Sequence, residues 1–313
     1  MSIRIPYNLR RFFTMYTYAF HQWLSFFYIY SFFGWIFESC YVSIKSRRLV
    51  NRGFLRLPML PLYGTGAVMM LWVSLPLQDS IAAVYLAGTI AASILEYVTG
   101  YVMERLFKMK YWDYSHLRFQ INGYVSLGSS LTWGLLTILL TEWVHRPISG
   151  FVLGLSPWIE FPVLAVLTVV FVLDAVQSTR EALDLGRALE AMTRMKAEAE
   201  ELQLQLALLK AETSQKVSEF KENAVQRAAG VAARAEQLQE NAAQKAADMA
   251  AKAADWQQRE ALLSSRLGAL REKRLQLYSH MSFYRRQLLK GNPTATSRRF
   301  AEALKELRSS LDR

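Results

Sequence analysis

The stretch "FFYIYSFFGWIFESCYVSIK", residues 26–45, gives the clearest indication of the fold class. It is an almost continuous apolar and aromatic run, and it has about the 20 residues that a helix needs to cross the hydrocarbon core of a bilayer. Glu38 lies well inside the run, although a carboxyl group at the centre of a membrane helix costs roughly 2.5 to 3.5 kcal/mol on insertion scales. The stretch therefore predicts a membrane helix in which Glu38 faces away from lipid.

The composition of the chain changes near residue 177. Residues 1–176 hold 13 of the 37 Lys and Arg residues, 8 of the 26 Asp and Glu residues, and seven of the eight prolines. The rest is charged, rich in Ala, Gln, Glu, Lys and Leu, and free of proline up to Pro293, which favours long helix. We therefore predict an all-α protein, a polytopic membrane helix bundle followed by a long cytoplasmic helical or coiled-coil tail.

Five segments are apolar enough to be spans, which predicts a transmembrane domain over 23–176. They cover about 23–44, 62–77, 80–105, 122–143 and 151–175. The second is the shortest, and its alternatives are a tilted, re-entrant or partly interfacial segment. Residues 1–22 mix arginines with aromatic residues, which is typical of a segment that lies in the membrane interface.

Basic residues are distributed unevenly among the predicted loops. The first loop carries Lys45, Arg47, Arg48, Arg52 and Arg56, and the third carries Lys108, Lys110 and Arg118. The second loop has none and the fourth has only Arg146, so the positive-inside rule places loops one and three in the cytoplasm. This predicts a multi-pass protein of the bacterial cytoplasmic (inner) membrane with the N-terminus outside and the tail cytoplasmic, against the opposing charges of Arg4, Arg10 and Arg11.

Polar residues of three predicted spans lie at one depth. At 1.5 Å per residue, Glu38, Glu96 and Ser129 are each roughly 10–13 Å from the same membrane face. This predicts a shared polar cavity that opens to the cytoplasm, with Arg52 or Lys45 as a counter-charge. The alternative is a set of separate hydrogen bonds between helices. The candidate cavity, ligand or partner residues are Glu38, Tyr41, Asn51, Arg52, Gly53, Tyr63, Glu96, Glu104, Trp112, Asp113, Tyr114, Asn122, Ser129 and Trp133.

Several ordered motifs resemble a known family. The motifs are "YSFFGWIFESCYVSIKSRRLVNRGFL" (30–55), "PLYGTGA" (61–67), "LEYVTGYVMERLF" (95–107), "YWDYS" (111–115) and "ING" (121–123) followed by "WG" (133–134). Over about residues 26–145 the chain is similar to the putative ABC-transporter type IV (CmpB-like) integral membrane family. The resemblance implies that the family's pattern residues here are Glu38, Asn51, Arg52, Gly53, Pro61, Tyr63, Gly64, Glu96, Gly100, Glu104, Trp112, Asp113, Tyr114, Asn122, Gly123, Trp133 and Gly134.

The resemblance implies a transport-related membrane protein, but it brings no substrate and no catalytic assignment. The family pattern often has a basic residue after Asn-Gly, where this chain has Tyr124. The chain has no G-x-x-x-x-G-K-[ST] phosphate loop, so a transporter of this kind would need a separate nucleotide-binding ATPase subunit. We predict no cofactor, and the four histidines have no metal-ligand spacing.

Three functional hypotheses follow. The first is a permease-like membrane subunit of a transport system, in which the polar cavity engages the substrate. The second is a membrane-anchored coiled-coil scaffold. The third is a membrane-embedded enzyme that acts on a lipid or small anionic substrate, for which two glutamates and an arginine could supply acid–base chemistry.

Residues 177–290 are predicted to form a long helix or coiled coil that self-associates or binds a partner helix. An early apolar seam (Met192, Met195, Ala199, Leu202, Leu206, Leu209) gives way to positions where Lys and Arg fill one of the two seam rows, so a folded-back coil or a solvated charged helix are alternatives. Gly230 and Gly268 are candidate bends, and interspersed charges argue against nucleic-acid binding. Residues 291–313 are predicted to form a linker and a short amphipathic helix (Phe300, Ala303, Leu304, Leu307, Leu311).

Overall fold

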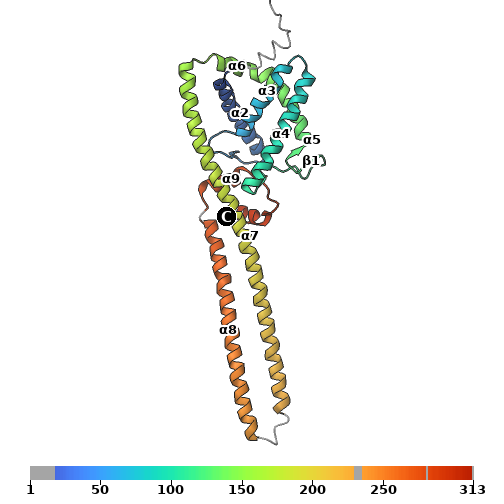
Figure 1. Cartoon of the computed structure of the whole chain (residues 1–313), viewed down its shortest axis with the longest axis vertical. Coiled ribbons are helices and arrows are strands. Elements are labelled where there is room, and N and C mark those ends of the chain that lie inside the picture. The colour runs from blue at the N-terminus through green and yellow to red at the C-terminus, as the bar shows by residue number, and fades with distance from the viewer. Residues whose placement is uncertain (1–17, 229–234, 280, 312–313) are drawn as a thin grey trace, which may run out of the picture. The chain divides into compact units, whose positions relative to one another are not determined.

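A computed structural model describes residues 18–228, 235–279 and 281–311 (Figure 1). Most of the predicted interfacial segment 1–22 and the predicted bend at Gly230 lie outside these residues. The chain divides into two compact units: residues up to Arg187 together with those from Ser282 on form the first, and Ala188–Met281 form the second. The segments predicted from the sequence had other bounds: 23–176, 177–290, and a linker with a short amphipathic helix over 291–313.

The first unit is built almost entirely from helices. They are α2 (Phe20–Ser46), α3 (Pro61–Ser74) with the short 3-10 turn η1 (Leu75–Leu77), α4 (Ile81–Phe107), α5 (Leu127–Leu139), the π-helical segment η2 (Leu140–Val144), α6 (His145–Leu153), the first part of α7 (Pro157–Ala228), α9 (Phe283–Gly291) and α10 (Ala301–Leu311). The protein is therefore nearly all-α, as the sequence predicts.

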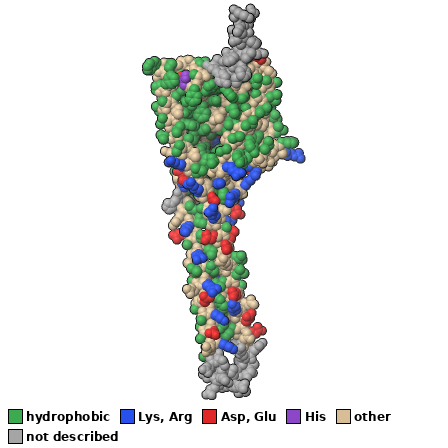
Figure 2. Space-filling view, viewed as in Figure 1, with side chains coloured by type: hydrophobic (Ala, Val, Ile, Leu, Met, Phe, Trp, Pro, Cys, Tyr) green, Lys and Arg blue, Asp and Glu red, His purple; other side chains and the backbone are tan. Residues whose placement is uncertain are grey.

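Three helices of the described chain are long and apolar enough to cross a membrane. They cover Ile81–Phe107, Leu127–Leu153 and the start of Pro157–Asn223, while Pro61–Leu77 is apolar but shorter. Helix α2 has the length, but its Tyr, Trp, Ser and Glu residues lower its hydropathy. Figure 2 shows hydrophobic side chains gathered over the helices of the first unit, and Lys and Arg side chains gathered where these helices give way to loops.

The start of the fourth predicted span, 122–143, differs from the structure. Residues 120–126 form a hairpin, with β1 (Gln120–Ile121) antiparallel to β2 (Val125–Ser126), so the helix expected from residue 122 starts at Leu127. Asn122 and Gly123 make the turn with φ of 53° and 74°, a left-handed conformation that Asn and Gly adopt more readily than other residues. Ser126 then caps α5 by accepting a hydrogen bond from the Ser129 backbone N–H.

The predicted loop at 144–150 is wrong. Residues 127–153 are helical throughout, because the π-helical segment η2 lets α5 run on into α6 without a break. The helices separate at Gly154–Ser156 instead, just before α7 begins at Pro157. Helix α7 then continues to Ala228, so the predicted fifth span and the beginning of the predicted tail are one helix.

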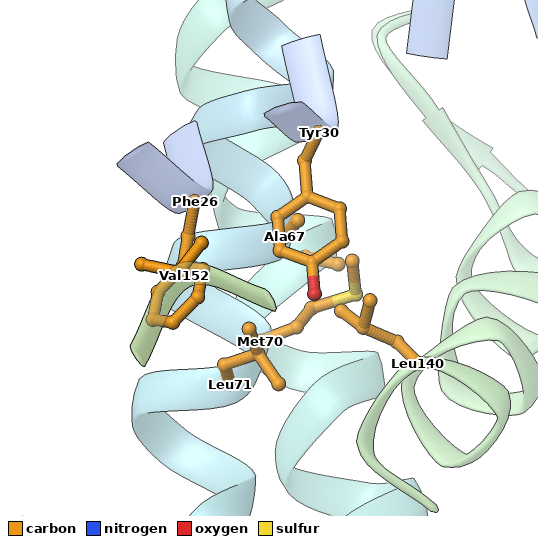
Figure 3. Packing of buried hydrophobic residues seen from close by; sticks show 8 residues of the cluster. Phe26, Tyr30, Ala67, Met70, Leu71, Leu140 and Val152 are labelled. Atoms are coloured by element: carbon orange, nitrogen blue, oxygen red, sulfur yellow. The ribbon is translucent and has the colours of Figure 1, made fainter. Parts of the chain in front are cut away.

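Glycines let the helices of the first unit approach closely. A Cβ at Gly34 of α2 would overlap the Tyr63 ring of α3, and a Cβ at Gly88 of α4 would overlap the Thr137 side chain of α5. A small apolar core fills the space between α2, α3, α4, η2 and α6 (Figure 3). Its buried members are Phe26, Tyr30, Ala67, Met70, Leu71, Ala92, Leu140 and Val152.

The C-terminal residues of the first unit pack against its loops. Thr296 forms a backbone bridge with Lys110 in the loop after α4, with N···O distances of 2.8 Å in both directions. Arg285 at the start of α9 forms ion pairs with Glu181 and Asp184 of α7. Helix α10 buries Ala303, Leu304 and Leu307, three members of the predicted amphipathic face.

The second unit is a helical hairpin. The later part of α7 and α8 (Ala235–Ser279) lie side by side, because Lys210 pairs with Glu260 at 3.2 Å and Lys216 lies over the Trp256 ring. Lys216 follows Lys210 along α7, whereas its partner Trp256 precedes Glu260 along α8. The two helices are therefore antiparallel (Figure 1). Helix α8 continues through Gly268, which is therefore not a bend.

Candidate functional site

Glu38 is held by an arginine and a tyrosine. The Arg52 Nε atom lies 3.4 Å from Glu38 Oε1, and the Tyr63 hydroxyl donates a 2.7 Å hydrogen bond to Glu38 Oε2. Gly34, one turn before Glu38 on α2, gives Tyr63 the room to lie against this helix. Of the two counter-charges that the sequence suggests, the structure brings Arg52 to the glutamate, whereas Lys45 is exposed and lies over the Tyr41 ring.

Arg52 itself is fixed by the C-terminal segment. Its Nη1 atom donates to the Asn292 side-chain oxygen at 2.7 Å and to the Gly291 carbonyl at 3.3 Å. Asn292 is 3% exposed, and its amide donates in turn to the Leu288 carbonyl. Because a buried charge is stabilised only when its hydrogen-bonding capacity is satisfied, the segment around Asn292 determines where the Arg52 side chain lies.

Glu96 has a different environment. Tyr114, Ser129 and Trp133 donate hydrogen bonds to its carboxyl group at 3.1, 3.2 and 3.2 Å. The side chain is 6% exposed, and in the part of the chain that the structure describes it forms no ion pair. Glu96 is thus a buried acid whose partners are all neutral, unlike Glu38.

Both acids line one cavity of about 490 Å³ within the first unit. Its charged lining residues, among those described, are Glu38, Arg52 and Glu96. The rest of the lining is mainly apolar or aromatic, and includes Phe54, Leu60, Tyr63, Leu95, Met103, Phe107, Tyr111, Trp112, Tyr114, Trp133 and Phe171, together with Asn292 from the C-terminal segment. A pocket of this size, apolar with a few convergent polar groups, is typical of small-molecule sites.

A second polar cluster surrounds Lys110. Its side chain is 1% exposed, and its Nζ atom lies 3.7 Å from Glu104, 3.8 Å from Asp113 and 2.6 Å from the Asn122 carbonyl oxygen. The ring of Tyr124 lies 4.5 Å from the same Nζ atom. From the sequence, Lys110 was counted as an ordinary loop charge. In the structure its buried ammonium group lies between Glu104, near the end of α4, and Asp113 in the following loop.

Tyr124, which departs from the family's pattern, takes part in this cluster. Its hydroxyl donates to Glu104, and its carbonyl accepts from the Trp112 indole N–H at 2.9 Å. Burial, with the hydrogen bond to Glu104 and the charge of that residue, raises the pKa of Tyr124 to about 12. Tyr124 is therefore a neutral hydroxyl donor at physiological pH, and Lys110 supplies the cation near Glu104.

Asp113 joins the same cluster to the C-terminal segment. It accepts hydrogen bonds from the Ser115 backbone and side chain and, at 3.0 Å, from the Thr296 hydroxyl. Partial burial acts to raise the pKa of Asp113, but these hydrogen bonds and Lys110 outweigh burial and lower it. The carboxylate is therefore charged over the physiological range.

The structure separates the predicted site residues into groups. Glu38, Arg52, Gly53, Tyr63, Glu96, Trp112, Tyr114 and Trp133 line the cavity, and Ser129 contacts it through Glu96. Glu104, Asp113 and Asn122 belong to the Lys110 cluster. Tyr41 is 54% exposed and outside both groups, and Asn51 accepts a hydrogen bond from the Trp35 indole at an exposed position.

Sequence reasoning missed Lys110 and Asn292. Lys110 could be suspected only from its position between the Glu104 and Asp113 carboxylates in the chain. Asn292 lies in a Gly-Asn-Pro sequence that predicts only the end of a helix. No local signal connects it to Arg52.

The part of the chain that forms this cavity is similar to a known protein family. The family model described as "Putative ABC-transporter type IV" matches residues 25–179. The chain resembles this family, as its motifs predict. The match extends past the predicted limit at residue 145 and covers all the cavity residues except Asn292. The match and the apolar helices together support a membrane protein that is similar to this family over residues 25–179. No curated protein and no solved structure matches the chain.

Proposed function

We propose that this protein is a permease-like membrane subunit of a transport system, and that its ligand occupies the cavity lined by Glu38, Arg52 and Glu96. The observation that carries the proposal is that two acids from different helices, the half-buried Glu38 of α2 and the buried Glu96 of α4, line one cavity of ligand size. Ionisable groups within membrane segments are costly, and they usually mark substrate or ion pathways.

The proposal includes five membrane segments. Three of these are the helices with sufficient length and hydropathy, and the other two are helix α2 and the segment Pro61–Leu77. The exposed apolar side chains of α2, among them Phe33, Phe37 and Ile44, favour contact with lipid on the side away from Glu38. The loops that carry Arg47, Arg48, Arg56, Lys108 and Arg118 are then cytoplasmic, and the cavity opens toward that side.

A transporter of this kind needs a source of energy outside this chain. The sequence has no phosphate-binding loop, so the proposal requires a separate nucleotide-binding ATPase subunit. The resemblance to a transporter family is compatible with such a partner.

The cavity proposal can be tested by complementation. Glu38→Gln and Glu96→Gln keep the size of each side chain but remove its charge, so both variants are expected to insert normally and to fail to restore the phenotype of a deletion strain. Glu142→Gln is a matched control, because Glu142 pairs with Arg146 outside the cavity. Full complementation by a Glu38→Gln/Glu96→Gln double variant would contradict the proposal.

A membrane-anchored scaffold is the second candidate. Its specific support is the hairpin of the second unit, where a groove of about 400 Å³ between α7 and α8 is lined by residues that include Leu209, Val217, Met249 and Trp256. Self-association or the binding of a partner helix would then use this hairpin. Deletion of residues 188–281 would abolish a scaffold function, whereas the permease proposal places the ligand elsewhere.

A further inference from the structure

We propose that the cavity takes an organic cation, an amine or quaternary ammonium that carries apolar groups. This inference rests on the proposed function and names the class of ligand for the same site. Three features of the cavity carry it: its balance of charges, its aromatic lining and its volume.

The balance of charges favours a positive ligand. Arg52 is already paired with Glu38 at 3.4 Å and is further satisfied by Asn292 and Gly291, so the one cationic side chain in the described lining is committed to protein partners. Glu96 has hydrogen-bond donors but no cationic partner among the described residues. A cation in the cavity would provide the counter-charge that Glu96 lacks.

The hydrogen bonds to Glu96 leave room for such a ligand. Tyr114 binds one carboxylate oxygen, while Ser129 and Trp133 share the other. All three groups donate, so they stabilise a carboxylate and orient it without neutralising its charge. An anionic ligand would instead lie near two carboxyl groups and an arginine that is already paired.

The aromatic lining matches the same class of ligand. Tyr63, Tyr111, Trp112, Tyr114 and Trp133 line the cavity together with three phenylalanines. The rings of Tyr63 and Trp133 contact each other nearly edge to face at 5.9 Å, and these two residues donate to Glu38 and Glu96 respectively. Aromatic faces attract cations, and aromatic cages are the established means by which proteins bind quaternary ammonium groups.

The volume and the mainly apolar lining of the cavity suit an organic cation better than a small hydrated metal ion. At about 490 Å³ the cavity is large enough for a molecule with several apolar groups. Leu60, Leu95, Met103 and Phe171 offer such groups a dry surface. In contrast, a metal ion would require several oxygen, nitrogen or sulfur ligands close together, and the described residues contain no cluster of three His, Cys, Asp or Glu side chains.

Binding of two ions of the same shape and opposite charge tests the inference. Full-length protein in nanodiscs of a zwitterionic lipid is titrated with tetraphenylphosphonium and with tetraphenylborate, and the signal from empty nanodiscs is subtracted. We expect saturable binding of the phosphonium, little binding of the borate, and about tenfold or greater loss of phosphonium affinity in Glu96→Gln. Glu142→Gln is the matched control and should bind as the wild type does.

Three results would overturn the inference. They are equal binding of the two ions, unchanged phosphonium binding by Glu96→Gln, and saturable binding of neither tetraphenylphosphonium nor the smaller tetraethylammonium. These failures differ from a failure of the proposed function: if the Glu96→Gln variant loses complementation but the two ions bind alike, the cavity is functional and its cation preference is wrong.

Discussion

Asn292 accepts a 2.7 Å hydrogen bond from the Arg52 guanidinium across 240 positions of sequence. Arg52 in turn pairs with Glu38, so a residue of the C-terminal segment helps to hold a half-buried acid of α2. The residues between them include the whole second unit, which the chain inserts between the first part of α7 and α9. The site is therefore complete only when the C-terminal segment is in place.

Substitution of Asn292 tests this dependence. Asn292→Ala removes the oxygen that Arg52 contacts at 2.7 Å, and a hydrogen bond to a charged group contributes about 1.5–3 kcal/mol. We expect a lower thermal midpoint of unfolding in nanodiscs and faster proteolysis of the segment from Ser282 on. Asn223→Ala is the control, because Asn223 is exposed and bonds only locally to the Glu219 carbonyl. Equal stability of the two variants would mean that the contact has no energetic role.

Helix packing can be tested with two glycines. Gly34→Ala places a methyl group where the Tyr63 side chain lies, and overpacking of this kind typically costs about 1–3 kcal/mol. Gly150→Ala is the matched control: no atom lies within 4 Å of its added Cβ, and alanine favours helix over glycine by about 0.5–1 kcal/mol. On heating, we expect Gly34→Ala to lose monodisperse protein at a lower temperature than the wild type, and Gly150→Ala to behave as the wild type does. The opposite order would contradict the packing of α2 against α3.

The Asp113 cluster predicts a pH dependence. Because the pKa of Asp113 is lower in the folded protein than its ordinary value of about 3.9, its charge stabilises the fold above that value, and this contribution is lost as the pH falls through the folded pKa. At pH 7, Asp113→Asn should therefore lower the thermal midpoint, and the difference from the wild type should begin to shrink below about pH 4 and disappear once the pH is below the lowered pKa of the folded protein.

The control for this pH dependence is Asp255→Asn. Asp255 forms an exposed ion pair with Arg259 four residues along α8, and such surface pairs contribute about 0–1 kcal/mol. Its thermal midpoint should follow the wild type at each pH. A constant difference between Asp113→Asn and the wild type from pH 7 to pH 3 would show that the charge of Asp113 is not the source of its effect.

The hairpin of the second unit predicts a crosslink within one chain. Lys210 and Glu260 pair at 3.2 Å, so cysteines at both positions in a Cys40→Ala background should react with a short bis-maleimide. We expect a band at the monomer mass with altered mobility, and each single-cysteine variant should lack it. Crosslinked dimers from the double variant alone would show that the two helices pair between chains.

Membrane orientation has a direct chemical test. Lys290 is exposed in the segment that we propose to be cytoplasmic. A cysteine at position 290 in the Cys40→Ala background should resist an impermeant maleimide in intact cells and react after permeabilisation. Labelling in intact cells would reverse the orientation and place the basic loops outside.

The parts of the fold that follow from local sequence were predictable. Asn122-Gly123 indicates a turn by its composition, and the small residue Gly88 indicates a face of α4 that another helix, α5, approaches. Glu38 and Arg52 could be paired because they are 14 positions apart, with the end of one helix between them.

Other features depend on contacts between distant residues. The position of Asn292 beside Arg52 is set by the packing of α9 and α10, and no periodic pattern encodes it. Lys110 was taken for a surface charge because its burial depends on the β1–β2 hairpin and on Thr296. The length of α7 was missed because the sequence changes from apolar to charged near Gln177 while the helix itself continues.

If this chain is the membrane subunit of a transport system, it should be bound to an ATPase subunit in its native membrane. The full-length protein would be purified in mild detergent from its native host and analysed by mass spectrometry with quantification of each component. We expect a nucleotide-binding ATPase subunit in a fixed ratio to this chain. Recovery of this chain alone, or only with proteins that have no nucleotide-binding domain, would contradict it.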